Sequence, residues 1–265
     1  MTRLVGLLLV LALPVAAAVK VKVTVVDKRT AEPVTGLTAG DFQVKVDNRV
    51  LPVEACAYEK EAIDVVLMLD SSQIGERIAS LAPSLISQLA GSEQMAIVSY
   101  DSGAELVQDF TSSKEILLAA LGRIRYGNSP ALTDALYAVA ADGFEDATFR
   151  RVILLLTTGV DGPASVSDEE LLRVCRRDGV SVYPVYMMKY GRSKLEKLAR
   201  STGGAAFSAQ QVSKGSGNPA VGIFESLRGR YELTLEGNLP LRGAANISIA
   251  GRNKKQLFVS YVDAE

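Results

Sequence analysis

The chain has 265 residues, with 29 basic and 30 acidic side chains and a formal net charge of −1. This length suffices for one substantial domain and a smaller one, and the absence of a basic block argues against a nucleic-acid partner. Histidine is absent, which excludes Ser-His-Asp and Cys-His catalysis and histidine-based zinc sites.

The first 18 residues have the layout of a secretory signal. Arg3 supplies a positive charge, residues 4–15 form an apolar run, and three alanines at 16–18 match a small-residue cleavage site. The apolar run is shorter than the ~20 residues of a membrane-spanning helix. We therefore expect residues 1–18 to be cleaved and the protein to be secreted or periplasmic, without stable membrane insertion. The alternative is an uncleaved anchor.

Residues 19–61 are patterned as β-strands. Valines alternate with polar residues from Val19 to Val25, as in a half-buried strand. A second alternation surrounds Asp47 and Asn48, which are typical hairpin-turn residues. It predicts strands over Phe42–Val46 and Val50–Tyr58.

Between residues 62 and 228 the pattern changes to apolar strands alternating with helices. The expected strands are Val65–Leu69, Met95–Ser99, Glu105–Phe110, Val152–Leu156, Val180–Val185 and Ala205–Ser208. The expected helices are Arg77–Leu89, Ser113–Ile124, Leu132–Asp142, Ser167–Arg177, Ser193–Ser201 and Ala220–Leu227. This alternation predicts an α/β domain with a doubly wound, mostly parallel sheet covered on both faces.

Residues 229–265 return to strands, expected at Tyr231–Glu236, Ala245–Ala250 and Gln256–Val262. Neither flank has enough strands to form an independent sandwich. We therefore expect residues 19–61 and 229–265 to build one β module, with the α/β domain of residues 62–228 inserted between its halves. The two cysteines, Cys56 and Cys175, are expected to be free thiols.

Three stretches of the α/β region, DVVLMLDSSQIG, GNSPALTDALY and LLLTTGVDG, carry a family resemblance. Together with the flanking PVTGLTAGDF and RGRYELTL, they resemble the von Willebrand factor A-type domains of secreted bacterial proteins. The resemblance implies a Rossmann-like doubly wound sheet and a non-enzymatic adhesion or protein-binding role. It also implies a metal-ion-dependent adhesion site, in which oxygens from three loops hold Mg²⁺ or a similar hard cation and a partner's carboxylate completes the octahedron.

This sequence matches the family's metal-ligand pattern only in part. Asp70 and Ser72 match two of the five ligand positions that the resemblance implies. The other three positions hold Ile74, Pro130 and Thr158, of which only the threonine has a side-chain oxygen. We therefore expect a degenerate site without a metal cofactor. The alternative is a residual Mg or Mn site at Asp70 and Ser72 that binds a carboxylate-bearing protein ligand.

The loops around this degenerate site are where we expect a protein partner to bind. The candidate contact residues are Ser71, Gln73, Ile74, Pro130, Thr158, Asp161 and Tyr186. A hydrolase is a further alternative, because Ser71, Ser72 and several acids share one edge of the expected sheet. The sequence contains neither G-x-S-x-G nor S-x-x-K, and it offers no histidine base.

Overall fold

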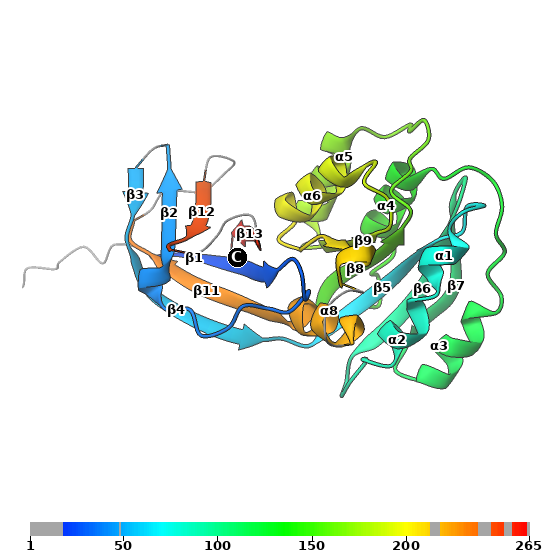
Figure 1. Cartoon of the computed structure of the whole chain (residues 1–265), viewed down its shortest axis with the longest axis horizontal. Helices are drawn as coiled ribbons and strands as arrows, with labels where there is room; N and C mark the ends of the chain where they lie inside the picture. Colours follow the sequence, from blue (N-terminus) through cyan, green and yellow to red (C-terminus); the bar gives the residue numbers. More distant parts are fainter. Residues whose placement is uncertain (1–17, 48, 213–217, 238–244, 252–255, 264–265) are drawn as a thin grey trace, which may run out of the picture.

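The computed structural model describes residues 18–47, 49–212, 218–237, 245–251 and 256–263. The expected signal segment therefore lies outside the described residues, except for Ala18. Figure 1 shows an α/β domain at the right and a smaller part made of antiparallel strands at the left. The expected architecture, an α/β domain with a β module built from both flanks, is confirmed.

The α/β domain is organised around a six-stranded sheet with the order β10-β9-β8-β5-β6-β7. Its strands are β5 (Ile63–Asp70), β6 (Gln94–Tyr100), β7 (Ala104–Thr111), β8 (Arg150–Thr157), β9 (Ser181–Tyr186) and β10 (Phe207–Ser208). Every residue of the central strand β5 is buried, which explains its continuous apolar run. All neighbouring pairs are parallel except β6 with β7, so the antiparallel β7 forms one edge of a mostly parallel sheet.

Helices cover both faces of this sheet. Their bounds are α1 (Glu76–Ala79), α2 (Ala82–Ile86), α3 (Lys114–Leu121), α4 (Leu132–Asp142), α5 (Asp168–Arg177), α6 (Arg192–Ser201), α7 (Ala209–Val212) and α8 (Pro219–Arg228). The crossovers from β5 to β6 and from β8 to β9 run in opposite directions across the sheet, so right-handed connections place α1 and α2 opposite α5. Helix α4 packs with α5, whereas α3 and α8 pack with α2.

One expected helix is divided. The segment Arg77–Leu89 forms the two short helices α1 and α2, with Pro83 in the first turn of the second. Proline has no backbone N–H and fits the first turn of a helix but not its interior, so a new helix begins just before it. The expectation of one continuous helix was wrong.

The β module is formed by both flanks of the chain (Figure 1). Its strands are β1 (Val19–Asp27), β2 (Phe42–Val46), β3 (Arg49–Leu51), β4 (Val53–Lys60), β11 (Gly229–Leu235), β12 (Ala245–Ile249) and β13 (Leu257–Asp263), and a short 3-10 helix spans Ala39–Asp41. They make two antiparallel sheets with the orders β13-β1-β11-β4 and β12-β2-β3. The expected strand Val50–Tyr58 is divided into β3 and β4, because the chain changes sheets at Pro52, which cannot donate to a ladder.

Tyr231 lies at the centre of the module's core. Its ring packs edge-on against Phe42, with centroids 5.2 Å apart. Its hydroxyl donates to the Val34 carbonyl at 2.8 Å and accepts from the Leu37 N–H at 3.0 Å. A buried tyrosine hydroxyl needs such partners, and here they attach the loop after β1 to strand β11.

Two chain crossings join the module to the α/β domain, and ion pairs surround them. The Arg228 guanidinium binds the Glu93 carboxylate in a bidentate pair of 2.8 and 2.6 Å and also donates to the Gln88 carbonyl at 2.8 Å. At the other crossing, Glu61 lies between Arg230 and Arg150. Burial alone would raise the pKa of Glu61, but the two arginines outweigh it and lower this pKa below its usual value.

Both cysteines are free, as expected: Cys56 lies in β4 and Cys175 on the buried face of α5. Burial raises the pKa of the Cys175 thiol to about 12, so the reactive thiolate is scarce near neutral pH. Within the described ranges, no helix is both long enough and apolar enough to cross a membrane.

Candidate functional site

The candidate site lies at the edge of the central sheet where parallel strands end. Strand β5 ends at Asp70 and its neighbour β8 ends at Thr157, with Leu69 paired to Leu156 just before. Loops that follow such ends gather at one edge, where open α/β sheets bind ligands. The three loops that the sequence singles out are Asp70–Glu76, Tyr126–Thr133 and Thr158–Ser165. The structure brings them together: Gly127 donates its N–H to the Ser71 carbonyl at 2.9 Å, and Gly162 donates to the Pro130 carbonyl at 2.7 Å.

The Asp70 carboxylate is the centre of this site, and both of its oxygens accept hydrogen bonds from the protein. Oδ1 accepts from the Ser72 N–H at 3.0 Å and from the Ser72 hydroxyl at 2.5 Å. Oδ2 accepts from the Thr158 N–H at 2.9 Å and from the Thr158 hydroxyl at 2.6 Å. All three residues are buried. Four donors thus surround one buried carboxylate and compensate its removal from water.

Gly75 allows this loop to fold tightly around Asp70. A Cβ on this glycine would lie 2.0 Å from the Asp70 carbonyl oxygen and 2.8 Å from its Oδ1. Asp70 and Ser72 do not cap the following helix, because α1 has no side-chain cap. The two residues instead fix the conformation of their own loop.

The side chains at this edge do not fit the Mg²⁺ or similar cation that the resemblance implies. Such a cation needs near-octahedral oxygen ligands and compensating negative charge, yet Asp70 is the one carboxylate among the five family positions, and each of its oxygens already accepts two hydrogen bonds from Ser72 or Thr158. Ile74 is apolar and 44% exposed. Pro130 offers only its carbonyl oxygen, which accepts from the Gly162 N–H at 2.7 Å.

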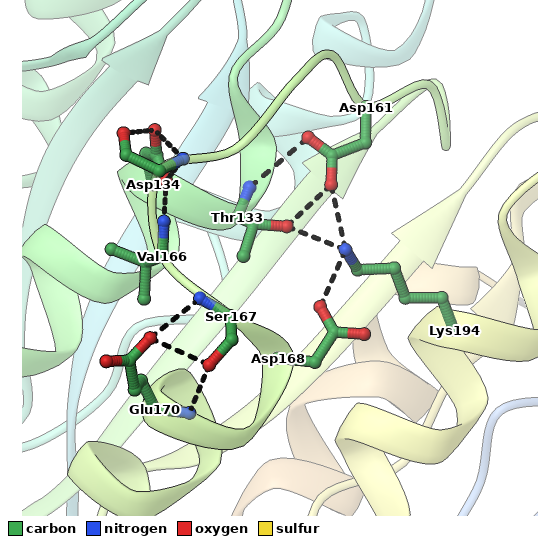
Figure 2. Close-up of polar contacts among 9 residues, drawn as sticks. Thr133, Asp134, Asp161, Val166, Ser167, Asp168, Glu170 and Lys194 are labelled. Atoms are coloured by element: carbon green, nitrogen blue, oxygen red, sulfur yellow. Dashed lines mark hydrogen bonds and ion pairs between the residues drawn. The ribbon is translucent and has the colours of Figure 1, made fainter.

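A second polar cluster lies at the same edge and contains a cation from the chain itself (Figure 2). The Lys194 ammonium, from the first turn of α6, donates to the Thr133 hydroxyl at 2.7 Å and to Asp161 Oδ2 at 2.9 Å. It also pairs with Asp168 Oδ1 at 2.8 Å. Burial would lower the pKa of Lys194, but Asp168 and Asp161 outweigh it and raise this pKa. The ammonium therefore stays charged and holds α4, α5 and α6 together.

The remaining acids of the edge stabilise loop backbone. The Asp134 carboxylate accepts from the Ser165 N–H at 2.9 Å. It also accepts at 3.0 Å from the N–H of Val166, a residue labelled in Figure 2. These bonds, together with the Ser165 hydroxyl, lower the pKa of Asp134. Asp101 accepts from Asn128 at 2.9 Å, which connects the loop after β6 to the loop before α4. Asp101, Asp134 and Asp161 all lie near the site, and each accepts hydrogen bonds from protein donors.

The candidate contact residues divide into exposed and buried groups. Gln73 and Ile74 are exposed, and Pro130 and Asp161 are half-buried. Ser71, Thr158 and Tyr186 are buried, so these three present little surface to a partner, and the prediction for them was wrong. Tyr186 is only 3% exposed because its side chain belongs to the hydrophobic core, where helix α6 packs on strand β9.

Two aromatic side chains add to the exposed surface. Tyr190 is 74% exposed, in the loop after β9, and its carbonyl approaches Gly159 so closely that a Cβ there would lie 2.6 Å away. Tyr126 is also exposed, and the next residue, Gly127, donates its N–H to the Ser71 carbonyl at 2.9 Å. We call the surface formed by Gln73, Ile74, Tyr126, Pro130, Asp161 and Tyr190 the loop edge.

Sequence reasoning identified Asp70, Ser72 and the three loops, but it missed the Lys194 cluster. Thr133 lies within the GNSPALTDALY stretch, three residues after Pro130, which occupies the family's ligand position. Lys194 and Asp168 belong to different helices, and only the tertiary structure brings them together. Charged residues in the first turns of helices are common, so no local signal distinguishes these two.

Comparison with known proteins gives the following matches. The family model of the von Willebrand factor type A domain matches residues 64–216, more than half of the chain. Proximal thread matrix protein 1 of the mussel byssus, described with a zinc-occupied MIDAS motif, aligns with a TM-score of 0.53 and 17% identity over 72% of this chain and 50% of its own. This chain thus spans half the length of the mussel protein.

A second solved structure, a von Willebrand factor type A protein from Catenulispora acidiphila, aligns with a TM-score of 0.51 and 14% identity over 95% of this chain and 74% of its own. At these identities the structural matches establish the fold alone. No curated protein sequence matches the chain significantly.

Proposed function

Because the chain belongs to the von Willebrand factor type A domain family, we propose that it is an exported, non-enzymatic module that binds a protein partner through its loop edge without a metal ion. Domains of this family commonly mediate protein–protein interaction or adhesion. Export is supported by the signal-like residues 1–18.

The observation that carries the metal-free mechanism is the hydrogen bonding of Asp70. Each of its oxygens already accepts two hydrogen bonds, and the Thr158 hydroxyl donates to the carboxylate from the position where the family pattern has an aspartate. A divalent cation would have to displace these donors without a second carboxylate to compensate its charge. Partner binding would therefore rest on hydrogen bonds and on exposed apolar side chains of the loop edge.

The same hydrogen bonds speak against a hydrolase. Ser71 and Ser72 are buried, and the Ser72 hydroxyl donates to Asp70. A nucleophilic serine needs an adjacent base and access to substrate.

Metal titration tests this mechanism directly. We expect no heat of binding when Mg²⁺, Mn²⁺ or Zn²⁺ is titrated into the metal-free protein up to about 1 mM, which corresponds to binding weaker than about 4 kcal/mol. The melting temperature should also be the same with chelator and with Mg²⁺. Saturable binding that is lost in Ser72→Ala would instead support the alternative, a residual Mg or Mn site that binds a carboxylate-bearing ligand.

Partner binding is tested by site-specific photo-crosslinking in the native organism. A photoreactive amino acid replaces Ile74, which is 44% exposed on the loop edge, or Val221, which is 46% exposed on α8. We expect one discrete crosslinked protein from position 74 and none from position 221. A second substitution, Tyr190→Ser, should weaken this crosslink because it removes a neighbouring exposed aromatic ring. Equal crosslinking from both positions would refute the loop edge as the binding surface.

A further inference from the structure

A groove with an apolar floor and an acidic rim lies outside the loop edge, between β6, β7 and α4. Its volume is about 360 Å³. The floor is formed by Ala96, Val98, Phe110, Ala138 and Val139. Alanines at three lining positions, 96, 104 and 138, leave the space open. Leu106, which is 60% exposed, adds an apolar side chain at the edge strand.

The rim of this groove is negatively charged. It carries four exposed carboxylates, Asp109, Asp142, Glu145 and Asp146. Among the described residues, no lysine or arginine forms an ion pair with any of these four carboxylates. Asp142 is also the last residue of α4, whose final turn has no basic residue. The negative end of the helix dipole therefore adds to the charge of the rim.

The combination of floor and rim selects one kind of occupant. An arginine or lysine side chain buries an aliphatic stem against apolar surface while its charged end stays in water. An arginine whose stem lies over Ala138 and Phe110 would bring its guanidinium to the level of the rim carboxylates, with which it forms bidentate pairs. A free sheet edge at β7 leaves the groove accessible to a chain in an extended conformation.

We propose that this groove is a second docking site, which takes an arginine- or lysine-bearing extended segment of a protein partner. It shares no residue with the loop edge, so it does not depend on the function proposed for that surface. Its affinity comes from a few solvent-exposed charge pairs over a small apolar floor and is therefore modest and sensitive to salt.

The test follows backbone amide resonances of the full exported chain by NMR. The probe is a short acetylated and amidated peptide of alternating leucine and arginine, and its control replaces arginine by citrulline, which has nearly the same shape but no charge. We expect the arginine peptide to shift resonances of residues 104–110 and 138–146 with a Kd on the order of 1 mM, and the citrulline peptide to shift none.

Two double variants, each of which removes two negative charges, distinguish binding in the groove from general electrostatic attraction to the protein. Asp142→Asn with Asp146→Asn should weaken peptide binding about tenfold. Glu115→Gln with Glu169→Gln, both exposed and outside the lining of the groove, should leave it unchanged. Ala138→Leu, which fills the groove, should abolish binding without unfolding the chain. Equal weakening by both pairs, binding of the citrulline peptide, or a dimer that buries the groove would overturn the proposal.

Discussion

Asp70→Ala is expected to destabilise the protein by roughly 3–5 kcal/mol, because it leaves buried donors of Ser72 and Thr158 without an acceptor. In a chain of this size such a loss lowers the melting temperature by roughly 10 °C. Thermal and urea unfolding, each measured with chelator and with Mg²⁺, would give the same loss in both conditions.

The matched control for this variant is Asp146→Ala. Asp146 is exposed and accepts no hydrogen bond among the described residues, so its removal should change the free energy of unfolding by less than about 0.5 kcal/mol. Asp70→Asn keeps the shape of the side chain but offers one acceptor oxygen in place of two, so its effect should be intermediate. If Asp70→Ala is as stable as the wild type, a structural role for Asp70 is contradicted. Such a result is typical of a carboxylate that serves a ligand, because functional groups of this kind commonly reduce stability.

Thr158→Asp is expected to destabilise the protein by placing a second carboxylate beside Asp70. The new carboxylate replaces a hydroxyl that donates to Asp70 at 2.6 Å, so two buried carboxylates meet and one hydrogen bond is lost. We expect a destabilisation of roughly 2–4 kcal/mol at neutral pH in chelator. The Thr158→Asn variant introduces a side chain of the same shape as aspartate but retains a hydrogen-bond donor, so it should lose less stability than Thr158→Asp.

The pH dependence of Thr158→Asp has a defined sign. Two adjacent carboxylates share a proton, so the folded protein holds that proton to a higher pH than the unfolded chain does. Stability therefore falls as the pH rises above about 4, the pKa of an unfolded aspartate, until the raised pKa of the folded pair is passed, and it is partly recovered in acid. Urea unfolding at a series of pH values measures this slope, and a flat profile for Thr158→Asp relative to Thr158→Asn would contradict it.

Adding Ile74→Ser and Pro130→Thr to Thr158→Asp supplies oxygen side chains at all three altered family positions. Mg²⁺ should then stabilise the triple variant by roughly 2–3 kcal/mol at a concentration near 100 times its Kd, with no effect on the wild type. If the triple variant binds no metal, the loops themselves have lost the required geometry, and three side chains do not explain the difference from the family pattern.

The fold was predictable because its strands and helices carry strong local patterns. The buried run of β5, the capping box of Ser167 and Glu170, and the alternating valines of β1 each indicate one element. The errors fall at Pro52 and Pro83, where the local pattern continues but proline ends a ladder or a helix.

The site was predictable only in part. Asp70, Ser72 and the converging loops follow from strand order and the family pattern. The exposure of each residue and the Lys194 cluster do not, because both depend on how separate helices pack. Tyr186 shows the difficulty: an aromatic residue at a strand end suits a contact surface and a core equally, and here helix packing on β9 places it in the core.

The two chain crossings have a mechanical consequence. Strand β4 enters the α/β domain where β11 leaves it, and Lys60 is paired with Gly229 at that point. A force that pulls the α/β domain away from the module therefore pulls β4 and β11 in the same direction. The two strands do not move relative to each other, so the hydrogen bonds between them bear no load. Strand β11 must instead slide along β1, its other neighbour. The hydrogen bonds of that ladder lie across the direction of sliding and resist together, so tension applied to the α/β domain is met in shear.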